Sequence, residues 1–161
     1  MNHADHPARK VALLTCMDPR IQLHAVLETP ASDTFVLRNG GGRVTEDVIR
    51  GLVLCTRMLG VTEIGVLHHT DCRLRGVTND QIAARTGVTM DYLPLPRSEA
   101  ADSVADDIGL LRASGLIPSA VSIWGGLYDV GRHTIGMTHH SAHIGTSPLP
   151  VTGLRHRERR A

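Results

Sequence analysis

The chain alternates short apolar runs with amphipathic segments. Apolar runs occupy residues 11–14, 35–37 and 64–67, and they predict strands at residues 11–15, 35–37 and 62–67. Between the second and third runs, residues 45–60 repeat apolar positions at helical spacing behind Thr45, a residue type that favours the helix N-cap. The pattern therefore predicts three buried strands, with a helix before the third.

The remaining segments predict further helices and a second pair of strands. Residues 21–27 have roughly helical spacing and end before Pro30, which a helix interior does not accept. The later predicted elements are a short helix capped by Asn79, a long amphipathic helix from Ser98 to Gly115, a strand at residues 120–130 and a hairpin partner at residues 134–138. Strands that alternate with helices in this order predict an α/β fold with a mainly parallel sheet and helices on its faces.

The composition fits one globular domain. Of the 161 residues, 42% are hydrophobic and 20% are charged, which excludes an intrinsically disordered chain. We expect an N-terminal arm at residues 1–10, a folded domain at residues 11–138 and a flexible tail with a basic end at residues 139–161.

Charge and cysteine content indicate the binding partners and the cellular compartment to expect. A formal net charge of +1 offers no general attraction for nucleic acid or for a membrane surface. The longest apolar run is too short to span a bilayer, and no charged-then-apolar leader opens the chain, so we expect a cytoplasmic protein. In that reducing setting, three cysteines are more often metal-binding or catalytic than joined in disulfides.

Candidate metal ligands follow two of the predicted strands. Cys16 follows the first strand, and His69 and Cys72 follow the third. Ligands bind at the carboxyl ends of the strands in open α/β sheets, so we expect these three side chains to converge. Zinc prefers thiolate and imidazole ligands, and three protein ligands leave a fourth position for a reactive water. The pattern therefore predicts a catalytic zinc (Zn²⁺) site.

A carboxylate and a guanidinium follow the first candidate ligand. Asp18 and Arg20 lie two and four residues after Cys16, and Pro19 restricts the backbone between them. An aspartate held by an arginine keeps its charge and its orientation. It could accept a hydrogen bond from zinc-bound hydroxide and orient that nucleophile, or it could take the fourth zinc position itself and switch the site off.

The other cysteine and the other histidines fit structural or solvated roles better. Cys55 lies among apolar residues of a predicted helix and is expected to be a buried, unreactive thiol. His68 is expected to support the fold rather than to bind metal. The remaining candidates fall in the predicted tail, where a solvated histidine cluster is the more common case: His139, His140 and His143.

Three segments resemble, in order and spacing, the motifs of the β-class carbonic anhydrases: Cys-Met-Asp-Pro-Arg at 16–20, Arg-Asn-Gly-Gly-Gly at 38–42 and His-His-Thr-Asp-Cys at 68–72. The resemblance implies a Rossmann-like sheet, a homodimer or larger homo-oligomer, and reversible hydration of carbon dioxide to bicarbonate by zinc-bound hydroxide. The implied roles are zinc ligation by Cys16, His69 and Cys72 and catalysis by Asp18 with Arg20. We further expect the substrate pocket to include Asn39, Gly40 and Gly41.

The chain departs from the family pattern at two positions beside the predicted site. Gly40 stands where the family usually has alanine, and Arg73 stands where it usually has glycine. Two alternatives therefore stay open. One is hydrolysis of a related heterocumulene, such as carbonyl sulfide, at the same zinc site. The other is a non-catalytic, zinc-stabilised protein whose basic tail binds a partner, although a structural zinc site needs neither Asp18 nor Arg20.

Overall fold

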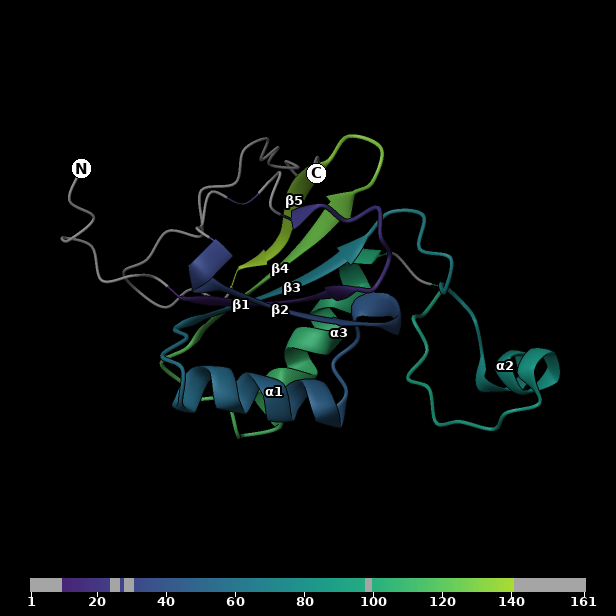
Figure 1. The fold of residues 1–161 in the computed structure, drawn as a ribbon, viewed down its shortest axis with the longest axis horizontal. Coiled ribbons are helices and arrows are strands. Elements are labelled where there is room, and N and C mark those ends of the chain that lie inside the picture. Colours follow the sequence, from purple (N-terminus) through teal and green to yellow (C-terminus); the bar gives the residue numbers. More distant parts are fainter. Residues whose placement is uncertain (1–9, 24–26, 28–30, 98–99, 141–161) are drawn as a thin grey trace, which may run out of the picture.

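The computed structural model describes residues 10–23, 27, 31–97 and 100–140, which form a five-stranded sheet with two long helices packed against one face and a short helix that lies apart from the sheet (Figure 1). The strands are β1 (Val11–Cys16), β2 (Thr34–Asn39), β3 (Glu63–His69), β4 (Ser122–Asp129) and β5 (Thr134–His140). The helices are α1 (Glu46–Arg57), α2 (Asn79–Thr86) and α3 (Ala100–Ala113), with 3₁₀ turns η2 (Ala31–Asp33) and η3 (Gly40–Gly42) on either side of β2. The predicted α/β class is confirmed.

The strand order is β2-β1-β3-β4-β5, in which the neighbours from β2 to β4 run parallel and β5 returns antiparallel to β4. Cys16 pairs in register with Asn39, and Thr15 pairs with Leu67. The carboxyl ends of β1, β2 and β3 therefore lie side by side at one end of the sheet, as the sequence pattern predicts.

The two faces of the sheet are covered differently. Helices α1 and α3 pack on the same face, where their side chains join those of the strands in one core: Ala12, Leu14, Val48, Leu52, Ile64, Val66, Val104, Leu111 and Ile123. On the opposite face, Ile21 and Leu23 from the segment after β1 pack onto a second core around Leu13 and Tyr128. Residues 24–26 of the helix predicted at 21–27 lie outside the described part of the chain.

Helix ends follow local hydrogen bonding. Thr45 is the N-cap of α1, as predicted, and its side chain accepts a hydrogen bond from Val48 N (3.4 Å). The prediction of Asn79 as the cap of α2 is wrong, because Thr78 forms a capping box with Gln81. The Asn79 side chain instead accepts a hydrogen bond from Tyr92 N (3.1 Å).

The last strand is longer than the sequence pattern predicts. Strand β5 continues through His140, and His139 pairs with Gly125 of β4, so the first two residues assigned to the tail belong to the sheet. The backbone ladder extends the strand past the last apolar residue of the pattern. The rest of the predicted tail, with His143, and residues 1–9 of the predicted arm lie outside the described residues. Within the described part, no helix has the length and hydropathy that crossing a bilayer requires.

A buried polar network connects α3 to β3 and to the segment after η3. The carboxylate of Asp107 accepts hydrogen bonds from Arg43 Nε (2.9 Å) and from Val44 N (3.1 Å). Asp107 Oδ2 also lies 2.9 Å from His68 Nε2, and the other ring nitrogen of His68 lies 2.8 Å from Ser103 Oγ. Buried charges are stable when they are paired and hydrogen-bonded, so this network fixes α3 against the strands. His68 thus has a structural position, as expected.

Candidate metal centre

Three candidate donor atoms meet at the end of the sheet where the parallel strands finish. Cys16 and His69 are the last residues of β1 and β3, and Cys72 lies in the turn after β3. All three residues are buried, and their donor atoms lie within 4.8 Å of one another. The parallel strands thus bring together side chains that are more than 50 residues apart in sequence.

The turn after β3 aims Cys72 back at the other two donors. Asp71 has φ 53°, a left-handed conformation that aspartate tolerates better than most residues. Thr70 anchors this turn to β4, because its backbone N donates to Tyr128 O (2.9 Å) and its hydroxyl accepts from Val130 N (3.1 Å). A fixed, tight turn therefore sets the position of the second thiol.

The His69 ring is oriented as a metal ligand requires. Its Nδ1 lies 2.8 Å from Thr70 O, and because a carbonyl only accepts, Nδ1 carries the hydrogen and Nε2 carries the lone pair. Nε2 is buried and has no hydrogen-bond partner among the described residues. A buried acceptor without a partner is costly, and a cation would satisfy it. The two sulfurs and one nitrogen form a donor set that fits zinc.

The thiols of Cys16 and Cys72 interact with each other. The pKa of Cys16 falls to about 4 because the Cys72 thiol donates a hydrogen bond to its sulfur, and burial only partly opposes this. The same interaction raises the pKa of Cys72. Negative charge therefore accumulates on sulfur in a buried place, where a divalent cation would compensate it.

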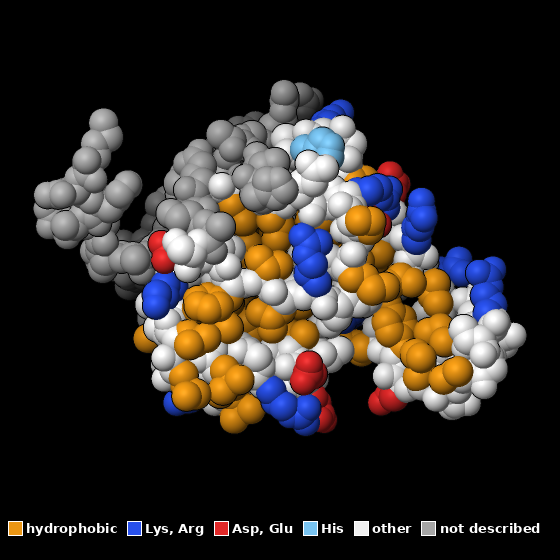
Figure 2. Space-filling model, in the orientation of Figure 1, with side chains coloured by type: hydrophobic (Ala, Val, Ile, Leu, Met, Phe, Trp, Pro, Cys, Tyr) orange, Lys and Arg blue, Asp and Glu red, His pale blue; other side chains and the backbone are white. Residues whose placement is uncertain are grey.

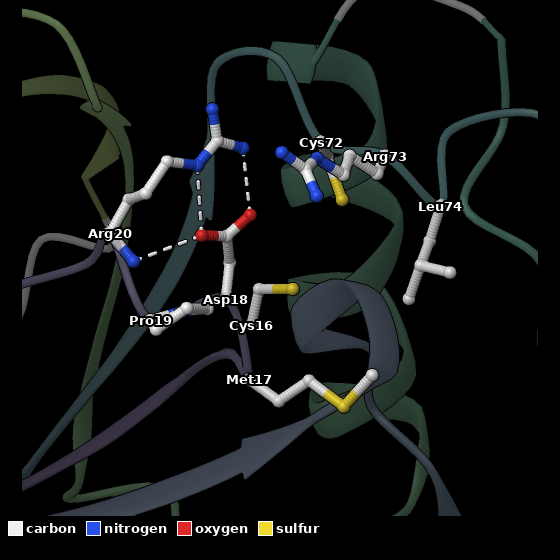
Figure 3. A pocket seen from close by; sticks show the side chains of 8 residues that line it. All are labelled: Cys16, Met17, Asp18, Pro19, Arg20, Cys72, Arg73 and Leu74. Carbon is white, nitrogen blue, oxygen red and sulfur yellow. Dashed lines mark hydrogen bonds and ion pairs between the residues drawn. The ribbon is translucent and has the colours of Figure 1, made fainter.

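Asp18 and Arg20 form a closed ion pair beside the donors (Figure 3). Arg20 Nε donates to Asp18 Oδ1 (2.9 Å), and a guanidinium nitrogen, Nη2, donates to Oδ2 (2.7 Å). The backbone N of Arg20 also donates to Oδ1 (3.0 Å). These contacts hold the pKa of the Asp18 carboxyl well below its usual range, chiefly through the Arg20 side chain. The same Nη2 reaches Asp71 O (3.0 Å), which joins the pair to the turn of Cys72.

A cavity of about 430 Å³ opens onto these groups, and it is lined by Cys16, Met17, Asp18, Pro19, Arg20, Cys72, Arg73 and Leu74 (Figure 3). Asn39, Gly40 and Gly41, which we expected in the substrate pocket, are not part of this lining. The side chain of Asn39 is occupied by backbone instead: it donates to Arg43 O (2.7 Å) and accepts from Arg43 N (2.8 Å). Asn39 thus closes the glycine loop rather than facing the cavity.

The glycine loop η3 lies directly against the end of β1, at Thr15 and Cys16. Gly42 has φ +70°, and a Cβ there would lie 2.8 Å from Cys16 N and 2.9 Å from the carbonyl carbon of Thr15. Such a contact with backbone cannot be relieved by a side-chain rotation. Only glycine lets η3 pass this close to the backbone of β1.

We expect Gly42→Ala to lower the free energy of unfolding by about 2–3 kcal/mol and to weaken zinc binding, because both the conformation and the contact are unfavourable. Urea denaturation and zinc competition titrations measure the two effects. Gly87→Ala is the matched control, since Gly87 also has φ +70° but a Cβ added there would meet nothing within 4 Å. Equal losses in the two variants would show that the close approach costs nothing.

Arg38 holds the backbone of the first motif. Its guanidinium donates to Cys16 O (3.2 Å) and to Ile21 O (3.0 Å). It also lies 3.4 Å from Asp18 O. The sequence offers no signal for this role, because all three acceptors are backbone carbonyls that any residue provides.

Among the described residues, Cys55 and His139 are not part of the donor cluster. Cys55 is buried in α1, and burial raises the pKa of its thiol, as expected for an unreactive cysteine. The ring of His139 lies 3.1 Å from Thr138 Oγ1 at the end of the sheet. Within the part of the chain that the structure describes, the gathered donors are Cys16, His69 and Cys72.

Known proteins share this sequence and fold. A family model described as carbonic anhydrase matches residues 11–95. β-Carbonic anhydrase 1 of Mycobacterium tuberculosis is 32% identical over 128 residues, which cover 77% of this chain and 78% of the relative. A carbon disulfide hydrolase of Saccharolobus solfataricus is 31% identical over 159 residues, which cover 81% of this chain and 78% of the relative.

Solved structures of both kinds of enzyme superpose on this fold. The crystal structure of carbonic anhydrase from Streptococcus mutans has a TM-score of 0.74 and 39% identity, and the match covers 86% of this chain and 88% of that chain. The apo form of a carbon disulfide hydrolase has a TM-score of 0.66 and 29% identity, over 80% of this chain and 77% of that chain.

Proposed function

Because this chain belongs to the β-carbonic anhydrase family, we propose that it is a zinc-dependent enzyme that reversibly hydrates carbon dioxide to bicarbonate. One observation carries the proposal: Cys16 and Cys72 line one cavity together with the bidentate Asp18–Arg20 pair, and the ring of His69 completes a set of three donors suited to zinc within 4.8 Å of one another. A binding protein stabilised by a structural zinc would need neither the pair nor an open coordination position.

We propose that Cys16, His69 and Cys72 hold the zinc ion. A zinc ion held there supplies Lewis acidity that lowers the pKa of a water molecule, so that a nucleophile is available near neutral pH. Three protein ligands leave one of the four usual positions for that water. Asp18 directs both carboxylate oxygens to Arg20, which favours its role as an orienting group over the alternative in which it becomes the fourth ligand.

In the proposed reaction, the residues of the cavity orient the reactants. Asp18 accepts the hydrogen of the attacking water or hydroxide, so that a lone pair of the oxygen points at the carbon of the substrate. Arg20 fixes this acceptor and keeps it ionised. Met17 and Leu74 give the cavity apolar surface, which suits a neutral, linear substrate.

Carbon disulfide hydrolysis is the second candidate, because several of the similar proteins are carbon disulfide hydrolases. A carbon disulfide hydrolase matches this chain at 31% identity, against 32% for a β-carbonic anhydrase. Carbon disulfide is also a linear heterocumulene, and attack of water oxygen on its carbon proceeds through carbonyl sulfide; two waters convert it to carbon dioxide and two hydrogen sulfides. A cavity of about 430 Å³ admits either substrate, so its volume does not select between them.

Side-by-side assays on one zinc-loaded preparation test these candidates. Stopped-flow measurement follows proton release from carbon dioxide, and sulfide release follows carbon disulfide and carbonyl sulfide. We expect carbon dioxide hydration to dominate. Sulfide release that exceeds carbon dioxide hydration at equal substrate concentration would assign the second function, and no turnover of any of the three would leave the zinc-stabilised binding protein.

We also propose that the chain works as a homodimer or larger homo-oligomer. Hydrophobic side chains gather on the surface near α1 and near α2 with its adjoining loops (Figure 2). The exposed large hydrophobic residues include Met17, Val36, Leu54, Met58, Val88, Met90, Leu110 and Leu116. A second copy would remove part of this apolar surface from water, and light scattering with sedimentation measures the assembly.

A further inference from the structure

Arg73 is the feature of the cavity that the proposed reaction leaves unused. It directly follows Cys72, its side chain is exposed, and it lines the same cavity as Cys16, Asp18 and Arg20. In Figure 3 the Arg73 guanidinium points toward the Asp18–Arg20 pair. Arg73 forms no hydrogen bond or ion pair with the other described residues.

The other guanidinium in the lining is already occupied. Arg20 donates from Nε and Nη2 to Asp18, and from Nη2 to Asp71 O. Three of its five N–H groups are therefore committed, two to the Asp18 carboxylate and one to the turn of Cys72. The guanidinium of Arg73 forms none of these bonds and can direct its donors to an anion that enters the cavity.

The charges of the cavity lining also favour the binding of an anion at Arg73. Two thiolates balance a bound zinc ion, and Asp18 balances Arg20. Arg73 therefore leaves the cavity lining with one uncompensated positive charge. The substrates considered above are neutral, whereas bicarbonate carries a negative charge on a planar group, which the guanidinium fork can bind through two hydrogen bonds.

We propose that Arg73 is an anion-binding residue that holds bicarbonate at the mouth of the metal centre, an inference that rests on the proposed function. Arg73 raises the affinity of the site for the anionic partner of the reaction and leaves affinity for the neutral partner unchanged. Arg73 thus determines specificity for the anion. It contacts the bound anion, and it does not orient the nucleophile.

The test combines direct anion binding with kinetics on the zinc-loaded protein. Calorimetric titration with thiocyanate, a monovalent anion, measures binding without turnover. We expect Arg73→Gln to weaken thiocyanate binding roughly five- to tenfold and to raise the KM for bicarbonate similarly, since it removes charge-assisted hydrogen bonds at a partly exposed site. Arg73→Lys keeps the charge but loses the fork, so its KM for bicarbonate should lie between those of the wild type and Arg73→Gln.

Arg85→Gln is the matched control, because it removes the same charge from the last turn of α2, outside the cavity lining. Its thiocyanate affinity should equal that of the wild type, and zinc content should be unchanged in all variants. Wild-type affinity in Arg73→Gln, or an equal loss in Arg85→Gln, would overturn the inference. Absence of carbon dioxide turnover in the wild type would instead contradict the proposed function, since the titration does not depend on turnover.

Discussion

Replacing Cys72 with alanine is expected to abolish zinc binding and, with it, catalysis. The variant leaves one thiolate and one imidazole, and two protein ligands hold zinc far more weakly than three. Turnover should fall by a factor on the order of 10³ or more, because no nucleophile is then available near neutral pH. Elemental analysis after dialysis measures bound zinc, and stopped-flow hydration measures turnover.

Cys55→Ala is the control for this variant. Cys55 is also buried, but it lies in α1 among apolar side chains and apart from the cavity. Its replacement should cost about 1 kcal/mol of stability and leave both zinc content and turnover intact. Circular dichroism checks that Cys72→Ala is folded. A folded Cys72→Ala protein with one zinc per chain would remove Cys72 from the metal centre.

Replacing Asp18 with alanine is expected to keep zinc and to lower turnover by about 10²-fold or more. The Asp18 carboxylate is held by Arg20 rather than by any of the three donor side chains, so the ligands stay in place without it. What disappears is the acceptor that orients the attacking oxygen, a contribution of about 10²–10⁴ in enzymes that use such groups. The loss should fall on kcat rather than on zinc affinity.

Asp18→Asn separates the charge of this acceptor from its shape. The amide fills the same space, but it offers one acceptor oxygen and weakens the pairing with Arg20. We therefore expect Asp18→Asn to resemble Asp18→Ala in turnover and the wild type in zinc content. Full turnover in either variant would exclude the Asp18–Arg20 pair from the mechanism, while the proposed zinc ligands would stand.

The candidate site could be predicted because parallel strands impose a simple geometry. Once residues 11–15 and 62–67 are read as neighbouring strands of one sheet, the residues that follow them must meet at one edge. Cys16, His69 and Cys72 therefore converge whatever the details of side-chain packing. The N-cap at Thr45 was equally predictable, because capping depends on a few neighbouring atoms.

The cap of α2 and the end of β5 were not predicted correctly, because local sequence signals did not decide them. Thr78 and Asn79 are both good caps, and the choice between them depends on Gln81 and on Tyr92, which engages Asn79 from 13 residues away. Strand β5 extends to His140 because β4 provides backbone partners, and a periodicity of apolar residues does not report such partners.

By itself, the sequence determined the order of strands and helices, the types of the candidate metal donors and the chain positions that supply them, since these depend on residue types and on short-range spacing. Only the tertiary structure decided that α1 and α3 share one face, that Gly42 must lie against the backbone of Cys16, and that Asp107 joins Arg43 to His68. It also decided that Arg73 turns toward the cavity. These features depend on which surfaces meet after folding, and contacts between distant segments leave no periodic trace in a single chain.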